Sequence, residues 1–140
     1  MCGTGVSRES AKIIADQGSN VTAGLVDAID AMHGIKREAL VMKECLLKGD
    51  FGGMLDSVRQ GWESKKRSAK TVSNPHIEEI YNSAIYAGAL AGKVSGAGGG
   101  FMMFFVPPEK RMDVIRMLGN FKGQISNCHF TKHGTQAWRV

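Results

Sequence analysis

A run of glycines in the second half of the chain has the composition of a loop that lets a ligand approach the backbone. Four of its five residues are glycine, and the apolar segment Phe101–Val106 follows directly. Glycine lacks a Cβ and adopts positive φ readily, so its peptide groups stay accessible. We expect a turn that contacts an anion or substrate and leads into a buried strand, although a glycine-rich hairpin turn without a ligand explains the same residues. The turn comprises Gly96, Ala97, Gly98, Gly99 and Gly100.

Two common phosphate-binding loops do not match this run. A nucleotide P-loop has Gly-Lys-Ser/Thr after its glycines and then a helix, whereas Gly92 and Lys93 precede the run and a strand is expected after it. The dinucleotide fingerprint fails because Phe101 stands where its third glycine belongs. The pattern that remains is a strand, a glycine loop and a second strand.

The densest positive cluster of the chain is the second candidate for binding chemistry. It spans residues 65–70, and its candidate phosphate contacts are Lys65, Lys66 and Arg67. Cations at a helix end complement the helix dipole, so a solvated helix end explains the cluster without a ligand. A clamp for a phosphorylated substrate is the functional alternative. Near the N-terminus, Arg8 follows the helix-capping candidate Ser7 and is either a solvated side chain or a further substrate contact.

The helices that must position these residues follow from apolar spacing and capping signals. The periodicity predicts a long amphipathic helix from residue 7 to near residue 34, a second over 36–48 and a third from 51 to about 66. Asn74 and a following proline then predict the start of a helix that continues to about residue 91. Three helices in succession imply a helical layer.

The strands come from the second half of the chain. Residues 101–106 predict a central strand covered on both faces, and Pro108 begins a helix that ends near Gly119. Residues 124–130 and 137–140 are weaker strand predictions, and residues 1–5 are too short and glycine-rich to predict an element. The order of elements gives an α+β layer architecture with a hairpin at the glycine loop.

Composition limits the class of partner. The chain has 140 residues, of which 43% are hydrophobic and 22% charged, as expected for one globular domain. Its net charge of +5 favours anionic partners, including sugar phosphates, ATP and nucleic acid. The aromatic residues are few and lie in apolar runs, and they lack a ribonucleoprotein pattern, so we expect no nucleic-acid partner.

Cysteine and histidine spacing predict neither a disulfide framework nor a metal site. Cys2, Cys45 and Cys128 are widely spaced, which favours a reducing cytoplasmic location. His129 and His133 have the spacing of a helical metal pair but lie in a segment predicted as strand and turn. No run of 18 apolar residues occurs, so we expect no membrane partner.

Several segments together resemble one kinase family. Lys93–Gly100 is similar to the C-terminal glycine motif of the GHMP small-molecule kinases. Within that family, Ser73–Ile77 and Ala87–Lys93 are most similar to the D-glycero-D-manno-heptose 7-phosphate kinases and their fucokinase-like relatives, as are Thr4–Arg8 and Phe130–Gly134. The resemblance spans nearly the whole chain, although the glycine run is one residue shorter than is usual in that subgroup.

The resemblance implies a division of labour between two domains. It implies that residues 1–140 are a ferredoxin-like C-terminal domain, with several helices on a small antiparallel sheet, that carries substrate contacts. In the family, the ATP-phosphate loop, the hydroxyl-activating residue and the Mg²⁺ ligands lie in an N-terminal domain, and no such phosphate-loop sequence occurs here. We therefore assign no catalytic residue to this chain and expect it to be inactive without an N-terminal kinase domain.

The implied reaction transfers the γ-phosphoryl group of ATP to a sugar phosphate. The expected substrate is D-glycero-D-manno-heptose 7-phosphate, and the product is the 1,7-bisphosphate. An uncovered apolar surface facing the missing domain would favour self-association. The alternative is a non-enzymatic small-ligand or nucleic-acid binding module on a ferredoxin-like fold, which the fold by itself does not exclude.

Overall fold

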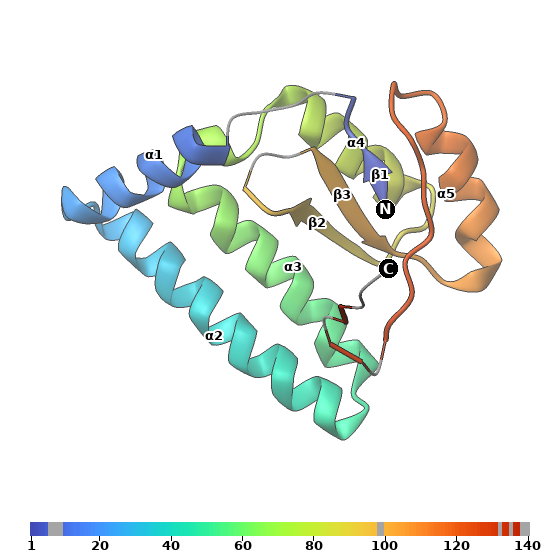
Figure 1. Cartoon of the computed structure of the whole chain (residues 1–140), viewed down its shortest axis with the longest axis horizontal. Helices are drawn as coiled ribbons and strands as arrows, with labels where there is room; N and C mark the ends of the chain where they lie inside the picture. The colour runs from blue at the N-terminus through green and yellow to red at the C-terminus, as the bar shows by residue number, and fades with distance from the viewer. Residues whose placement is uncertain (6–9, 98–99, 132, 135, 138–140) are drawn as a thin grey trace.

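The computed structural model of the chain describes residues 1–5, 10–97, 100–131, 133–134 and 136–137. Within these residues, the structure has five α-helices and a small antiparallel sheet (Figure 1). The strands are β1 (Cys2–Gly3), β2 (Ala91–Ser95) and β3 (Phe101–Phe105). The helices are α1 (Ser10–Thr22), α2 (Val26–Lys48), α3 (Phe51–Ser68), α4 (Pro75–Tyr86) and α5 (Arg111–Leu118), with 3-10 turns η1 (Lys70–Val72) and η2 (Pro108–Lys110).

The sheet has the strand arrangement of a ferredoxin-like domain. Its order is β1-β3-β2, and both pairings are antiparallel. On the free side of β1, an isolated antiparallel bridge joins Cys2 to Ile125. Gly3 N donates to Gln124 O at 2.8 Å, and Ser126 N donates to the Met1 carbonyl at 2.9 Å. The segment after α5 thus takes the place of a fourth strand beside β1, which confirms the predicted α+β, ferredoxin-like class.

The N-terminal segment is an integral part of this sheet. The sequence offered no element there, yet Cys2 and Thr4 are 1% and 2% exposed. Gly5 has a φ of +72°, and a Cβ at this residue would lie 2.1 Å from the carbonyl oxygen of Lys122. The glycines that made the segment look flexible allow it to thread between β3 and the chain after α5.

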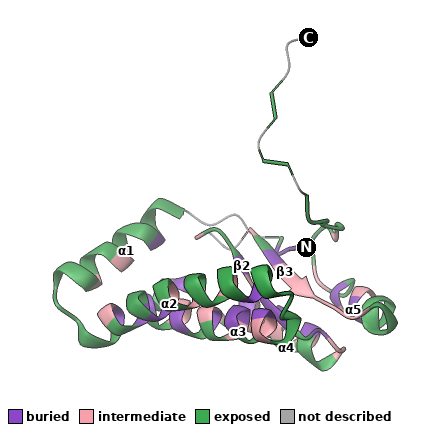
Figure 2. Ribbon diagram, turned by 90° about the horizontal axis from the view of Figure 1, so that it is seen from below, coloured by how far each residue is buried: buried purple, intermediate pink, exposed green. Residues whose placement is uncertain are grey.

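The helical layer covers one side of the sheet. Figure 2 shows α2, α3 and α4 on the same side of β2 and β3. The core at this interface includes Trp62, Val94 and Met102, all fully buried. Tyr81 continues it, with ring centroids 6.3 Å from Trp62 and 6.2 Å from Phe104. Burial of these aromatic and aliphatic side chains fixes the position of α3 against β2.

The first two predicted helices have different boundaries in the structure. Instead of a break near Gly34, the break falls at Gly24, which has a φ of +70°, and α2 continues through residue 34. A Cβ at Gly34 would lie 2.5 Å from Ser64 Oγ. Gly34 is therefore the point of close approach between α2 and α3, so the prediction of a helix end there was wrong.

The later boundaries confirm the capping predictions but not every length. Asn74 Oδ1 accepts a hydrogen bond from Ile77 N at 2.8 Å, with Pro75 as the first helical residue. The helix ends at Tyr86 and not near residue 91, because Ala91 already begins β2. β3 is central, as predicted, but Phe101 is exposed and only Met102 is fully buried, so the strand is not covered on both faces.

Of the weak strand predictions near the C-terminus, the one over 124–130 is confirmed only at its start, beside β1, and most of the one over 137–140 is not tested. Within residues 124–130 only the bridge at Ile125 forms, and Ala137 lies outside any strand. Residues 138–140 lie outside the described residues. The helix predicted after Pro108 is confirmed by η2 and α5.

Candidate functional site

The glycine run forms the connection of the β2–β3 hairpin. Ser95 pairs with Phe101 as the last pair of the ladder, so residues 96–100 are the loop between them. Gly96 has a φ of +69°, and a Cβ at either Gly96 or Gly100 would meet no described atom within 4 Å. Ala97 is described and partly buried, whereas Gly98 and Gly99 lie outside the described residues. The described parts of this turn leave open space around the backbone.

Both ends of the turn are held by groups from elsewhere in the chain. The carbonyl of Gly100 accepts hydrogen bonds from Thr4 N at 3.0 Å and from Thr4 Oγ1 at 3.4 Å. The Thr4 carbonyl lies 2.9 Å from His76 Nε2, which joins the turn to α4. At the other end, Lys65 Nζ donates to the Gly96 carbonyl. The turn is therefore anchored to β1 and α3 through its carbonyls.

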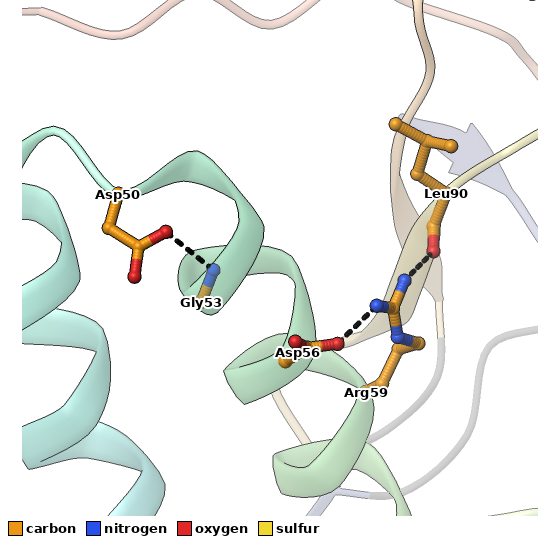
Figure 3. A network of polar contacts seen from close by, with 5 residues as sticks. All are labelled: Asp50, Gly53, Asp56, Arg59 and Leu90. Carbon is orange, nitrogen blue, oxygen red and sulfur yellow. Dashed lines mark hydrogen bonds and ion pairs between the residues drawn. The ribbon is translucent and has the colours of Figure 1, made fainter.

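Two cations of α3 bind the carbonyls at the two ends of β2. Arg59 donates to the carbonyl of Leu90, just before β2, and also pairs with Asp56 on its own helix (Figure 3). Lys65 binds the carbonyl of Gly96, just after β2. At the start of α3, Asp50 Oδ1 accepts from Gly53 N at 2.9 Å and caps the helix (Figure 3). These contacts fix the strand that precedes the glycine turn on the helix that carries the basic cluster.

The helix separates the three basic candidates instead of gathering them. Lys66 lies against α4, with Nζ 2.9 Å from Glu63 and 3.6 Å from Glu78, and within 6 Å of the Trp62 and Tyr81 ring centroids. Burial alone would lower the pKa of Lys66, but the hydrogen bonds and charges of the two glutamates outweigh it and raise the pKa. Lys66 therefore already has anionic partners within the domain.

Arg67 belongs to a different surface again. It lines a cavity of about 550 Å³ together with Asp16, Asp27 and Lys70, between α1, the start of α2 and η1. Of the three cluster residues, Lys65 is the one that forms a hydrogen bond with the described part of the glycine turn. Successive residues of a helix point about 100° apart, which explains why neighbours in sequence do not form one patch. Arg8 lies outside the described residues.

A second lysine joins Lys65 in a cavity beside the turn. The cavity has a volume of about 540 Å³ and is lined by residues of α1, α2, α3 and β2, among them Gln17, Trp62, Lys65 and Lys93. Burial lowers the pKa of Lys65, and the positive charge of Lys93 lowers it further. The sequence pattern did not single out Lys93, because Lys65 lies 28 positions away on another element. A strand over residues 91–95 would have shown Lys93 on the face opposite Val94.

The chemistry available in the described part of the site is charge stabilisation and positioning. It offers two ammonium groups, a buried threonine and the glycine turn. The described residues contain no group of three or more His, Cys, Asp or Glu side chains that could hold a metal ion. None of the described helices is long and apolar enough to cross a membrane.

Comparison with known proteins decides the family. The model for the C-terminal domain of GHMP kinases matches residues 42–123, which run from within α2 to the end of the turn after α5. The chain belongs to the GHMP kinases. This match contains both cavity lysines and the glycine turn, whereas Thr4 and Gln17 lie outside it.

Individual relatives agree with this assignment. The chain is 41% identical over 138 residues to a D-glycero-alpha-D-manno-heptose 7-phosphate kinase of Campylobacter jejuni, a match that covers 98% of this chain and 40% of the relative. The crystal structure of a Campylobacter jejuni protein described as a sugar kinase aligns with a TM-score of 0.60 and 45% identity, over 79% of this chain and 34% of that one.

A more distant structure supports the fold alone. Leishmania major mevalonate kinase, solved with R-mevalonate, aligns with a TM-score of 0.73 at 22% identity, over 84% of this chain and 36% of that one. The chain thus spans 34–40% of the length of the proteins that it matches.

Proposed function

We propose that residues 1–140 are the C-terminal, substrate-side domain of a GHMP sugar kinase. In this proposal, the γ-phosphoryl group of ATP passes to D-glycero-D-manno-heptose 7-phosphate and gives the 1,7-bisphosphate. The observation that carries the proposal is the glycine turn, which is anchored at Thr4 and Lys65 but open around Gly96 and Gly100. We propose the heptose substrate from the name of the relative that is 41% identical across almost the whole chain.

The turn supports the proposal because neither of its described glycines has a neighbour at its Cβ position. Gly96 needs glycine for its positive φ, whereas a Cβ at Gly100 would meet no described atom within 4 Å. In this proposal, the substrate or a facing domain lies beside position 100. Phosphoryl transfer depends chiefly on positioning and on stabilisation of developing charge, which a preorganised backbone turn can supply.

The remaining roles in the reaction belong to a partner domain in this proposal. An N-terminal kinase domain supplies the ATP-phosphate loop, the Mg²⁺ ligands and the group that activates the accepting hydroxyl. Gly96 to Gly100 face the sugar, and Lys65, Lys66, Arg67 and Arg8 remain the candidate contacts for its phosphate. Of these, the geometry favours Lys65, because Lys66 is paired with two glutamates and Arg67 lines another cavity.

Location and association follow from the same proposal. The three cysteines are free, which is consistent with a reducing cytoplasm in which a sugar bisphosphate would feed nucleotide-sugar biosynthesis. Exposed apolar side chains at the α2–α3 turn, including Leu46, Leu47 and Phe51, offer a surface for self-association when no other domain covers it. The family match favours a kinase domain over a non-enzymatic binding module.

A chimera tests the proposed function. This chain replaces the matching 40% of the Campylobacter jejuni relative, and ADP release is measured with D-glycero-D-manno-heptose 7-phosphate and Mg-ATP. The chain alone and the truncated relative alone serve as controls. We expect turnover only in the chimera. A folded chimera without activity, beside an active intact relative, would overturn the heptose assignment, and turnover by the chain alone would overturn the division of labour.

A further inference from the structure

We propose that Lys65 and Lys93 together form the binding site for a phosphate monoester, in the cavity between α1, α2, α3 and β2. The inference rests on the proposed function only for the identity of the ligand, which is then the phosphate that the sugar already carries. The two lysines come from α3 and β2 and are 28 positions apart in the chain, so the site exists only in the folded domain.

The cavity is large enough and suitably lined for a phosphorylated sugar. Its volume of about 540 Å³ falls in the range of small-molecule sites. Gln17 supplies a polar amide from α1, while Met32, Ile35 and Trp62 supply apolar walls. Lys65 also donates to Gly96 O, so one end of the cavity adjoins the glycine turn. A ligand held by the lysines would therefore lie beside the turn that the proposed function places at the sugar.

The two cations lack a compensating anion among the described residues. Neither Lys65 nor Lys93 forms an ion pair there, in contrast to Lys66. Glu38 also lines the cavity, but its carboxylate pairs with Arg37 at 3.4 Å, and its Cβ lies beside Gly61, one helical turn before Lys65. Two neighbouring ammonium groups that are partly withdrawn from water repel each other, and a phosphate between them would remove that repulsion.

The electrostatics of Lys65 agree with this geometry. Burial lowers the pKa of its ammonium group, and the charge of Lys93 lowers the pKa further. One of its three N–H donors is used by Gly96 O, which leaves donors for a phosphate oxygen. A lysine that served only as a brace for the turn would not need a second lysine in the same cavity.

Two sources could supply a terminal phosphate group to this site: the phosphate monoester of the sugar, or the anhydride-linked γ-phosphate of ATP. The binding experiment therefore uses the whole 140-residue chain with four probes: inorganic phosphate, D-glycero-D-manno-heptose 7-phosphate, the same heptose without phosphate, and Mg-ATP. NMR of the lysine side chains reports which ammonium groups respond. We expect the signals of Lys65 and Lys93 to shift with inorganic phosphate and heptose 7-phosphate, and not with the unphosphorylated heptose.

Variants connect these shifts to affinity. Lys65→Gln and Lys93→Gln should each weaken binding of heptose 7-phosphate by about 10–100-fold, the usual effect of losing one charge-assisted hydrogen bond. Lys93→Arg keeps the charge and should retain most of the affinity. Lys43→Gln is the matched control, because Lys43 is exposed on α2 and does not line the cavity. Melting temperatures of all variants identify any that fail to fold.

The outcomes separate this site from the proposed function. Wild-type affinity in both folded Gln variants would overturn the site, even with an active chimera. A shift of the two lysine signals by Mg-ATP alone would overturn the assignment to the sugar phosphate. In the chimera, the same Gln variants should raise KM for heptose 7-phosphate by about 10-fold or more without raising KM for ATP. Anion binding by the chain with a folded but inactive chimera would retain the site and overturn the heptose assignment.

Discussion

The close crossing of α2 and α3 at Gly34 allows a quantitative test of the fold. In Gly34→Ala, the new Cβ would lie 2.5 Å from Ser64 Oγ and 3.1 Å from Ser64 Cβ. The first distance is roughly 1 Å shorter than an ordinary van der Waals contact. Ser64 is buried, so the helices or the serine must move. Overpacking of this kind costs about 1–3 kcal/mol, while Ala in place of Gly inside a helix gains roughly 0.5–1 kcal/mol.

We therefore expect Gly34→Ala to lower the free energy of unfolding by up to about 2.5 kcal/mol, with a central value of about 1 kcal/mol. Urea denaturation followed by circular dichroism measures it. Gly18→Ala is the control, because a Cβ at this position of α1 meets nothing within 4 Å, and it should stabilise the domain by roughly 0.5–1 kcal/mol.

A double-mutant cycle attributes the cost to one pair of atoms. Ser64→Ala removes the Oγ that causes the closest contact, so Gly34→Ala should cost less in that background, with a coupling energy of about 1 kcal/mol. If Gly34→Ala stabilises the protein as much as Gly18→Ala does, the crossing of the two helices is looser than described and the reasoning is wrong. If the cost is unchanged by Ser64→Ala, the cost has another origin.

Three further predictions follow from the turn, the ion pairs and the N-terminal strand. Gly100→Ala should leave the free energy of unfolding within about 0.5 kcal/mol of wild type but lower kcat/KM of the chimera by roughly 10–100-fold. Gly96→Ala should itself lower the free energy of unfolding by about 1–2 kcal/mol because of the positive φ of Gly96. Equal activity of Gly100→Ala and wild type would contradict a substrate-facing turn. Lys66→Met should lower the free energy of unfolding at neutral pH. Because the pKa of Lys66 is raised in the folded state, the difference from wild type should shrink as pH rises above about 10.5 through the folded pKa. Urea titrations at neutral pH and above the folded pKa measure this difference, and a difference that stays constant would argue against the ion pairs. Gly5→Ala places a Cβ 2.1 Å from the backbone oxygen of Lys122, at a residue with positive φ. It should lower the free energy of unfolding by about 2–4 kcal/mol and abolish the hydrogen-exchange protection of β1. Retained protection would refute the position of this strand between β3 and the chain after α5.

Local signals in the sequence were sufficient for much of the fold. The cap of α4 was predictable because Asn74 followed by Pro75 satisfies helix N-terminal groups whatever the rest of the chain does. The hairpin was predictable because glycine and a following apolar run determine a turn and a strand locally. The boundary of α2 was not predictable, because glycine is found both at helix ends and where two helices cross. Only the position of Ser64 shows that Gly34 lies at a crossing.

The candidate site was predictable in part for the same reason. The glycine turn was identified from its residues and forms the hairpin loop, but its anchors at Thr4 and Lys65 are 96 and 31 positions from the carbonyls they bind. Lys93 was overlooked because its partner lysine lies on another element. Contacts at such separations depend on packing of whole elements and leave no periodic pattern in the sequence.

The sequence alone determined the family resemblance, the turn and the types of most elements, since backbone preference and apolar spacing act over a few residues. Tertiary structure decided which cations meet. It directed Lys65, Lys66 and Arg67 to three different surroundings, brought Lys93 beside Lys65, and placed residues 1–5 between β3 and the chain after α5. The physical reason is that a helix turns by about 100° per residue, so the face on which each charge lies, and therefore its partner, depends on which elements pack against that helix.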